Sequence, residues 1–386
     1  MKKILVIHNK YRVTGGEDIA VSKEIALLKQ KFEVKVLFFD NTIKNYLKQI
    51  FYFLLNSNTD SDRQIKKILK EFTPDIAYVH NTWFKGSLGV FKVLKESNIS
   101  TVLKLHNFRY YCTKSYTTKN HLVNNQPCQA CGLNKDQLGL FNKYFQNSWL
   151  QSLIVNRYGK KYFKIIRYLD IQILVLTTFH KKFLIELGIE KQRIKVLPNY
   201  ISVPKNMEDR FLDDYIVYAG RISPEKGVKE LISAFNNIKN NKSVLKIIGV
   251  GPSYEELKKT YSSDKIQFLG QLPNQEVIEF ISKSKGVVTA TKLFEGQPTL
   301  LCEASCLGVP SVFPKTGGIT EFYPLDYPFS FEQFNYGDLQ KKLELLLTDN
   351  QLRQQGTKNK MYISKYLDKQ RLLAEFDQIV VDSNGQ

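Results

Sequence analysis

Two glutamates eight residues apart delimit a stretch of this chain whose residue types can do chemistry, Glu295-Gly-Gln-Pro-Thr-Leu-Leu-Cys-Glu303. The apolar run before it, 286–291, is rich in valine and threonine and predicts a buried parallel strand. Pro298 suits the start of a helix, because the first turn leaves its N–H groups unpaired and proline has none to lose. Such a helix N-terminus binds phosphate, and carboxylates accept hydrogen bonds from sugar hydroxyls. The stretch therefore indicates a ligand that carries phosphate and sugar, with two solvent-facing glutamates around a tight turn as the alternative.

Two cations, Arg221 and Lys226, stand five residues apart in a loop that follows the expected strand 215–219. The arginine fork and the lysine point charge both suit a pyrophosphate group. The next expected strand is followed by Gly249 and Gly251, which allow a close approach of backbone. We expect these loops and the two glutamates to belong to one phosphate-binding edge of a sheet.

The N-terminal half offers a histidine and a glycine pair. The expected strand 101–105 leads directly into His106, which could donate a hydrogen bond or carry charge at the ligand-binding edge of a parallel sheet. Gly15 and Gly16 follow the first expected strand, 4–8, at the corresponding position. A glycine pair is ordinarily a turn, and three of the other four histidines also stand near strand ends, so position alone does not single out His106.

Three cysteines, Cys112, Cys128 and Cys131, form a C-x15-C-x2-C pattern with His121 between them. Three thiolates and an imidazole would complete a tetrahedral zinc site, which would be structural because four protein ligands close it. Free thiols that pack a long loop are the alternative. The odd total of five cysteines argues against a disulfide scaffold and favours a reducing compartment.

Two α/β domains are needed to position these groups. A chain of 386 residues with 43% hydrophobic residues is long enough and apolar enough for two cores. Strands alternate with helical patterns up to about residue 200, and the series begins again after the polar segment 202–213. We predict a basic, doubly wound α/β domain over 1–200, a ligand-binding, doubly wound α/β domain over 201–364, and a C-terminal helix over 365–386 that could cross back to the first domain. The expected strands are 4–8, 33–39, 75–79, 101–105 and 171–176, then 215–219, 244–248, 266–269, 286–291 and 309–313.

The net charge lies entirely in the first domain. Residues 1–200 hold 33 Lys and Arg against 14 Asp and Glu, a surplus of 19, whereas residues 201–386 hold 23 of each. A domain this basic is expected to meet polyanions, although lysine-rich solvated faces are an alternative explanation. The sequence has no zinc-finger spacing, RNP motif or basic-zipper heptads, so nucleic acid is not favoured. An anionic membrane surface or a phosphorylated lipid is the better interpretation.

Two segments with helical patterns, 41–70 and 141–168, place basic residues beside apolar and aromatic ones. This arrangement suits an interfacial membrane contact, and packed helices with solvated lysines would look much the same. The apolar run at the N-terminus is too short for a signal peptide, and no stretch approaches the ~20 apolar residues of a membrane-spanning helix. We expect a cytoplasmic protein that is peripheral at the inner face of the cell membrane.

The sequence resembles the family-4 glycosyltransferases of GT-B fold over nearly its whole length. The most specific feature is the E-x7-E motif from Glu295 to Glu303, in the context E-G-x-P. Supporting features are Gly220-Arg221 with Lys226-Gly227, Gly249-x-Gly251-Pro252, Gly15-Gly16-Glu17 and His106. The segments HNKYRVTGGED and HNFRYYC resemble bacterial members that build surface polysaccharides such as capsule or exopolysaccharide.

The resemblance implies two Rossmann-like, doubly wound parallel-sheet domains that face each other across a cleft, with a nucleotide sugar held mainly by the second. Arg221 and Lys226 would bind the donor diphosphate and stabilise the departing nucleoside diphosphate. Glu295 would hold the transferred sugar, and Glu303 the ribose hydroxyls. The backbone at Pro298, Thr299 and Leu300 would contact sugar or phosphate. The loop of Gly15 and Gly16 would approach the donor, and His106 would contact the sugar near its reacting carbon.

The resemblance also implies transfer with retention of configuration and without a divalent metal or other cofactor. In agreement, the D-x-D sequence Asp60-Ser-Asp62 lies in a predicted surface segment, away from the expected site. Gln297 stands where an aromatic or small residue is more usual in the family, which leaves the sugar preference open. The acceptor would be a saccharide, lipid-linked if the basic half meets a membrane.

Other functions on the same fold are a phosphorylase, a nucleotide-sugar epimerase, and a non-catalytic membrane-associated subunit that lost turnover. The presence of both cations and both glutamates argues against the non-catalytic subunit. No carboxylate pair at glycosidase spacing can be identified, so a hydrolase has no specific support.

Overall fold

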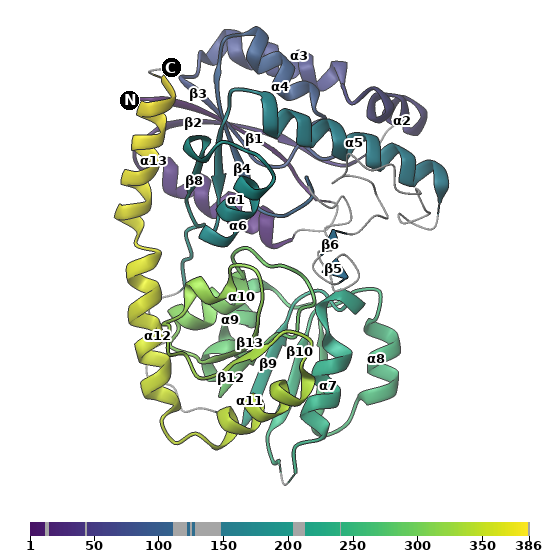
Figure 1. Cartoon of the computed structure of the whole chain (residues 1–386), viewed down its shortest axis with the longest axis vertical. Coiled ribbons are helices and arrows are strands. Elements are labelled where there is room, and N and C mark those ends of the chain that lie inside the picture. Colours follow the sequence, from purple (N-terminus) through teal and green to yellow (C-terminus); the bar gives the residue numbers. More distant parts are fainter. Residues whose placement is uncertain are drawn as a thin grey trace. The chain divides into compact units, whose positions relative to one another are not determined.

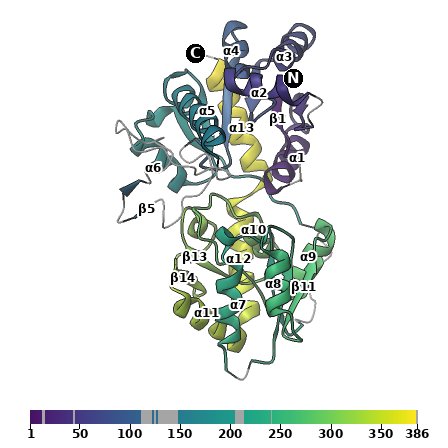
Figure 2. The same ribbon diagram turned by 90° about the vertical axis from the view of Figure 1, so that its right-hand side faces the viewer.

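The computed structural model describes residues 1–11, 15–42, 45–110, 122–123, 126–127, 148–203, 213–239 and 241–384. It divides into two compact α/β units, which Figures 1 and 2 show in two views. The N-terminal unit comprises Met1–Tyr200 and Asp368–Gln386, and the C-terminal unit comprises Ile201–Leu367. Each unit is built on a parallel six-stranded sheet with helices around it, which confirms the predicted fold class.

The sheet of the N-terminal unit has the strand order β2-β1-β3-β4-β7-β8. Its strands are β1 (Lys3–Asn9), β2 (Glu33–Phe39), β3 (Ile76–Val79), β4 (Ser100–Leu105), β7 (Gln172–Val175) and β8 (Ile194–Val196). The helices are α1 (Gly16–Leu28), α2 (Tyr46–Leu55), α3 (Thr59–Phe72), α4 (Gly89–Glu96), α5 (Trp149–Tyr168), α6 (Thr178–Glu186) and α13 (Lys369–Asn384). A separate two-stranded antiparallel pair is formed by β5 (Leu122–Val123) and β6 (Gln126–Pro127). The strand order reverses between β1 and β3, the kind of position where ligands bind in such sheets.

The last helix of the chain, α13, completes the core of the N-terminal unit. Its residues Leu372, Phe376 and Val380 are buried in one cluster with the sheet residues Val6 and Tyr78. The Phe376 and Tyr78 rings lie 4.9 Å apart between centroids. Both termini of the chain therefore belong to the same unit.

The sheet of the C-terminal unit has the order β11-β10-β9-β12-β13-β14. Its strands are β9 (Tyr215–Ala219), β10 (Val244–Ile248), β11 (Ile266–Gly270), β12 (Gly286–Val288), β13 (Ser311–Lys315) and β14 (Ser330–Glu332). The helices are α7 (Val228–Asn236), α8 (Tyr254–Tyr261), α9 (Asn274–Lys283), α10 (Thr299–Cys306), α11 (Tyr336–Thr348) and α12 (Leu352–Tyr366). All its strand pairs are parallel, so the loops at their carboxyl ends gather at one edge of the sheet.

Two expected helical segments are divided in the structure. Segment 41–70 forms α2 and α3, because Asn56 adopts a left-handed conformation and the side chain of Asn58 caps α3 by accepting from two backbone N–H groups. The C-terminal helix begins at Lys369 rather than at residue 365. There α12 has ended at Tyr366, and the Asp368 carboxylate accepts a hydrogen bond from the Arg371 N–H at 2.8 Å.

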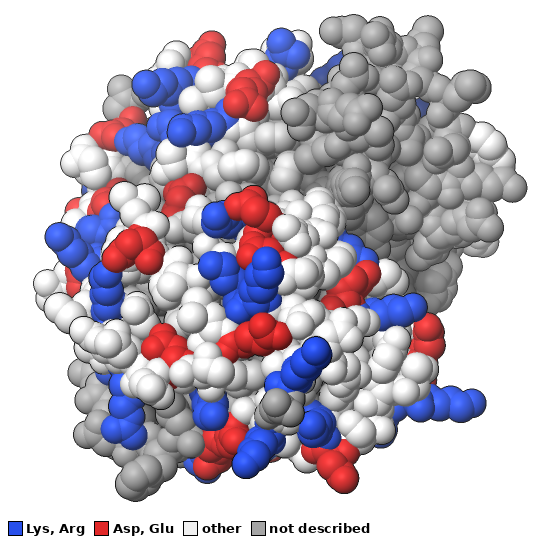
Figure 3. Space-filling view, turned by 60° about the horizontal axis from the view of Figure 1, so that its bottom comes forward, with Lys and Arg blue, Asp and Glu red and all other residues white. Residues whose placement is uncertain are grey.

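Charged side chains of both signs are interspersed on the face that Figure 3 shows, with the C-terminal unit turned forward. This agrees with the equal numbers of acidic and basic residues after residue 200. Among the described residues, no helix has the length and apolar character needed to cross a membrane.

Candidate functional site

The C-terminal unit brings Lys226 and Glu295 together at the carboxyl edge of its sheet. Lys226 ends a short 3-10 turn after β9, and Glu295 lies in the loop between β12 and α10. The Lys226 Nζ lies 2.6 Å from Glu295 Oε1, and the Thr291 hydroxyl donates to the same oxygen at 3.0 Å. The two charged side chains are 29% and 23% exposed, so solvent and a ligand can reach them. These predicted catalytic residues, 69 positions apart in the sequence, form one ion pair.

Close backbone packing holds these two loops against each other. Gly227 has a φ of +69°, and a Cβ there would lie 2.0 Å from the carbonyl oxygen of Ala290. Only glycine tolerates both the left-handed backbone and that contact. On the other side of the site, the Gly318 N–H donates to the Glu295 carbonyl at 2.8 Å. The geometry of the ion pair is thus set by the backbone beneath it.

The loop that carries Arg221 rests on the predicted donor-binding glycines. Gly249 has a φ of +125°, and a Cβ there would lie 2.0 Å from the Gly220 carbonyl oxygen. A Cβ at Gly251 would lie 2.3 Å from the carbonyl oxygen of Ile222. Arg221 itself is exposed, and its guanidinium makes no hydrogen bond or ion pair with any residue that the structure describes. It is available for an anionic ligand.

The N-terminus of α10 lies in the same group of loops. Pro298 is its N-cap residue, and Thr299 and Leu300 are half-buried in the first turn, whose N–H groups have no intrahelical acceptor. Glu303 lies one turn further along the helix and is only 4% exposed. Gln297, the residue that departs from the family pattern, is also buried.

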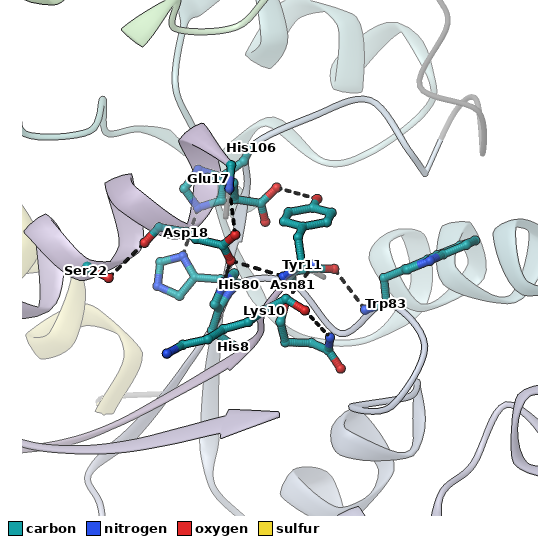
Figure 4. A network of polar contacts seen from close by, with 12 residues as sticks. His8, Lys10, Tyr11, Glu17, Asp18, Ser22, His80, Asn81, Trp83 and His106 are labelled. Atoms are coloured by element: carbon teal, nitrogen blue, oxygen red, sulfur yellow. Dashed lines mark hydrogen bonds and ion pairs between the residues drawn. The ribbon is translucent and has the colours of Figure 1, made fainter. Parts of the chain in front are cut away.

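The carboxyl ends of β1, β3 and β4 carry a polar network in the N-terminal unit (Figure 4). The Nε2 of His106 lies 2.9 Å from the Nδ1 of His80, and the two rings are stacked at 5.2 Å between centroids. Burial lowers the pKa of both imidazoles well below its ordinary value, so both are neutral near pH 7 and one must donate to the other. In this structure His106 is therefore a hydrogen-bonding group and not a cation.

The loop of Gly15 and Gly16 is held to β1 through Asp18. The Asp18 carboxylate accepts from the Gly15 N–H at 3.0 Å and from the Tyr11 N–H at 3.3 Å. Its Oδ1 also lies 2.9 Å from the Nε2 of the buried His8 (Figure 4). Gly15 serves as the N-cap of α1, and Gly16 begins the helix.

A small cavity of about 20 Å³, room for one water molecule, lies beside this network. Its lining includes Glu17, Asn107 and Arg109. Glu17 accepts from the Tyr11 hydroxyl at 2.8 Å and from the Asn107 amide at 3.1 Å, and burial raises the pKa of its carboxyl group. The Arg109 guanidinium lies 4.6 Å from the Trp83 ring, and two of its buried nitrogens have no partner among the described residues.

No separate role was predicted from the sequence for His80, Glu17 or Arg109. His80 stands at the end of a strand, and the other two lie inside the segments HNKYRVTGGED and HNFRYYC. These two segments were recognised in the sequence by their resemblance to the family, but only the folded structure shows which of their side chains are in contact.

The cysteines of the expected zinc site, Cys112, Cys128 and Cys131, lie outside the described residues. Within the described part of the chain, no three His, Cys, Asp or Glu residues gather in a way that could hold a metal ion. Asp60 of the D-x-D sequence lies in the first turn of α3 and is paired with Lys48 at 2.8 Å. Zinc binding and metal-independent catalysis stay predictions.

Residues 208–361 match the family model described as glycosyl transferases group 1. Among curated proteins, the uncharacterized glycosyltransferase YqgM of Bacillus subtilis is 29% identical over 163 residues, which are 39% of this chain and 44% of that protein. The lipopolysaccharide 1,2-N-acetylglucosaminetransferase of Salmonella typhimurium is 27% identical over 178 residues, 40% of this chain and 46% of that protein. The chain thus spans about half the length of the curated relatives it matches.

Two solved structures are similar over nearly the whole chain. Sucrose-phosphate synthase from Thermosynechococcus elongatus aligns with a TM-score of 0.71 at 13% identity, covering 99% of both chains. The Anabaena protein Alr3699/HepE in complex with UDP-glucose aligns with a TM-score of 0.67 at 13% identity, covering 99% of this chain and 100% of that one. At these identities the likeness shows the fold. The chain therefore has the GT-B fold, and its residues 208–361 are similar to the glycosyl transferases group 1.

Proposed function

We propose that this chain is a retaining glycosyltransferase that moves a sugar from a nucleotide-diphosphate sugar to a saccharide acceptor in surface polysaccharide synthesis. The observation that carries the proposal is the Lys226–Glu295 ion pair of 2.6 Å, which lies at the same sheet edge as Arg221 and the N-terminus of α10. The family match over 208–361 covers all of these residues. Retention of configuration rests on the family resemblance.

The chemistry follows from the charges at this edge. When the glycosidic bond of the donor breaks, the leaving nucleoside diphosphate gains negative charge. The Arg221 guanidinium, the Lys226 ammonium and the positive end of the α10 dipole stabilise that charge, and they stabilise it most in the transition state. No metal is needed for this role in the proposed mechanism.

Glu295 first pairs with Lys226 and then binds the transferred sugar. Before the donor binds, its carboxylate balances the Lys226 ammonium at 2.6 Å. A donor diphosphate competes for the ammonium, which leaves the carboxylate free to accept hydrogen bonds from hydroxyls of the transferred sugar. Donor binding thus exchanges one ion pair for two ligand contacts.

The donor and acceptor are proposed by analogy. Alr3699/HepE was solved in complex with UDP-glucose, and the Salmonella relative is named as a lipopolysaccharide 1,2-N-acetylglucosaminetransferase. A third relative is the capsular polysaccharide biosynthesis glycosyltransferase CapM of Staphylococcus aureus, 28% identical over 176 residues. We therefore propose a UDP-sugar as the first donor to test and a lipid-linked saccharide at an anionic membrane surface as the acceptor.

The test is thermal unfolding of the full chain with nucleoside diphosphates and nucleotide sugars, with and without EDTA, followed by a transfer assay. A ligand that binds the folded state raises Tm, so the correct donor should shift it, and EDTA should not abolish the shift. Lys226→Ala should remove the shift. Lys229→Ala, a change at an exposed lysine on α7, is the matched control and should retain it.

Stabilisation by no nucleotide sugar would contradict the proposal and favour the non-catalytic subunit. A donor that binds and is transferred with inversion would contradict the retaining mechanism alone. A lower Tm in the presence of EDTA, measured without donor, would support structural zinc at the three cysteines outside the described residues.

A further inference from the structure

Helix α2 turns an apolar stripe toward solvent. The large side chains on this stripe are between 38% and 82% exposed, and they are Leu47, Ile50, Phe51, Leu54 and Leu55. Residues at this spacing lie on one side of a helix and ordinarily pack on a protein core. Here a different side of α2 is packed, since Phe53 is buried and stacks on Tyr158 of α5 at 5.4 Å. The exposed stripe is therefore additional to the face that anchors the helix.

The first turns of α5 extend this apolar surface. Trp149, Leu150 and Leu153 are between 52% and 66% exposed. The two helices lie side by side in both ribbon views, and the Lys161 ammonium donates to the carbonyl oxygen of Leu55 at 3.4 Å. We call the exposed residues of the two helices the α2–α5 face.

The charges on these helices all have one sign. Neither α2 nor α5 contains an aspartate or glutamate. Together they carry six basic residues, which are Lys48, Arg157, Lys160, Lys161, Lys164 and Arg167. All six are exposed. Along α5 the exposed residues pass from apolar ones at its start to basic ones in its later turns.

We propose that the α2–α5 face docks the protein on an anionic lipid membrane. The apolar side chains would enter the boundary between headgroups and acyl chains, Trp149 would sit at the headgroup level, and the basic residues would contact anionic headgroups. Association with a second copy through this face would bring the basic residues of α5 on the two copies together, because among the basic residues of the two helices only Lys48 has a described ion pair, with Asp60. Complementarity of charge therefore selects an anionic partner, and the large aliphatic residues select lipid.

This inference rests on the proposed function in one respect, namely that membrane docking would bring the N-terminal unit to a lipid-linked acceptor. Lipid binding itself requires no donor and no transfer. It can therefore be measured separately from activity.

The experiment is co-sedimentation of the full chain with phosphatidylcholine vesicles that contain or lack phosphatidylglycerol. We expect binding only to the vesicles with phosphatidylglycerol, and weaker binding in high salt. One variant, Arg157→Gln/Lys160→Gln/Lys164→Gln, removes three charges and should weaken binding roughly 100-fold. A second variant, Leu47→Ser/Phe51→Ser/Leu150→Ser, removes apolar contacts and should weaken it by at least about tenfold.

Matched controls lie in the C-terminal unit. Lys229→Gln/Lys239→Gln/Lys259→Gln removes three exposed charges, and Leu325→Ser/Met361→Ser removes exposed apolar groups. Both should bind the vesicles like the parent protein. Donor-induced stabilisation should be the same in all variants, which shows that each one is folded and that donor binding is independent of lipid binding.

Three results would overturn the proposal. One is equal binding to both vesicle types, and another is binding by the two α2–α5 variants that matches the parent. The third is that the parent protein binds no vesicles and forms a dimer, whereas the apolar variant is a monomer. That result would assign the face to a second copy. Absence of a donor shift with normal lipid binding would contradict the proposed transferase function and leave this inference standing.

Discussion

A single oxygen atom, Oε1 of Glu295, accepts hydrogen bonds from both the Lys226 ammonium and the Thr291 hydroxyl. The carboxylate is therefore oriented before any ligand arrives, and the lysine is held at the place where a diphosphate would bind. Such preorganisation matters for catalysis because groups already in position need not reorganise when charge develops. The consequence can be tested one residue at a time.

Lys226→Ala should lower kcat by roughly 100- to 1000-fold, the usual cost of removing one group that stabilises developing negative charge. Glu295→Gln should also lower the rate, and the double variant should lose less than the product of the two effects, because the partners act as a unit. Steady-state transfer kinetics with the donor found by thermal unfolding check this. Full activity in Lys226→Ala would remove that residue from the site.

A buried histidine away from this site should make stability depend on pH. The His180 ring lies 2.7 Å from the Tyr110 hydroxyl, and burial lowers its pKa to about 3. The unfolded chain binds a proton on this ring below about pH 6.5, whereas the folded chain does not until pH approaches 3. This histidine thus costs no stability above pH 6.5, and the folded state loses up to about 1.4 kcal/mol per pH unit as the pH falls below it.

His180→Gln should remove this contribution. Relative to the parent protein, its free energy of unfolding should fall less between pH 6.5 and 4.5, by roughly 2–3 kcal/mol. Urea unfolding at a series of pH values measures the difference, and curves recorded between pH 7 and 8 should run parallel as an internal control. Parallel curves over the acid range as well would show that the ring titrates normally in the folded protein.

The residues that sequence reasoning identified are those with local signals. Glu295, Arg221 and Lys226 stand in strand-to-helix loops, where charge type and spacing point to phosphate and sugar. His80 and Arg109 also stand at or after strand ends, but the sequence does not show what they contact. The contacts of His80 with His106 and of Arg109 with Trp83 depend on the packing of separate strands. The near-complete burial of Glu303 also could not be predicted from the sequence.

At the scale of elements, the position of Lys226 depends on a turn that only glycine can make. Gly227 joins the 3-10 turn of Lys226 to α7 and leaves no space for a Cβ against Ala290. A side chain there must move either α7 or the segment after β12, and either movement separates Lys226 from Glu295. The turn thus links the stability of the unit to the geometry of the site.

Gly227→Ala should destabilise the C-terminal unit by more than about 2 kcal/mol, since left-handed strain and a backbone clash act together. It should also abolish donor-induced stabilisation. Gly337→Ala at the start of α11 is the control, because the nearest atom to its added Cβ is a side-chain oxygen at 3.6 Å. Urea unfolding and donor titration check both variants, and normal donor binding by Gly227→Ala would contradict the role given to the turn.

Most strands could be predicted because both faces of each sheet are covered, so the strands are nearly continuous apolar runs. The strands β8 and β14 were missed because each has only three residues, whereas β12, which is equally short, belongs to the longer apolar run 286–291. The division of 41–70 into two helices depends on capping by Asn58, a polar residue that ordinarily could also lie within a helix surface. Boundaries of this kind follow from local capping hydrogen bonds and not from periodicity.

At the scale of the molecule, composition alone showed that one half is basic and the other neutral, and repetition of the α/β pattern showed two units. A return of the C-terminal helix to the first domain was expected, but the residues that α13 contacts could not be predicted, because an amphipathic pattern does not specify what its apolar side packs against. The structure places Phe376 and Leu372 in the N-terminal core, and Asp377 forms ion pairs with Lys2 at 3.2 Å and Lys31 at 2.8 Å.

Phe376→Ala should therefore destabilise the N-terminal unit by about 3–5 kcal/mol, the usual cost of removing a buried aromatic ring. Val381→Ala on the same helix removes an exposed side chain and should cost little. Calorimetry together with limited proteolysis can show which unit unfolds first. A lower transition in the C-terminal unit, rather than in the N-terminal one, would contradict the assignment of α13.

The return of α13 to the first unit also affects the order in which the protein is made. A ribosome releases residues 201–367 before it releases the helix that completes the core of residues 1–200. The unit that is synthesised second can thus fold first, while the unit that is synthesised first waits with Phe32 and Tyr78 lacking their contacts with Phe376. We expect a chain that ends at residue 367 to hold a folded C-terminal unit beside an N-terminal segment whose core is incomplete.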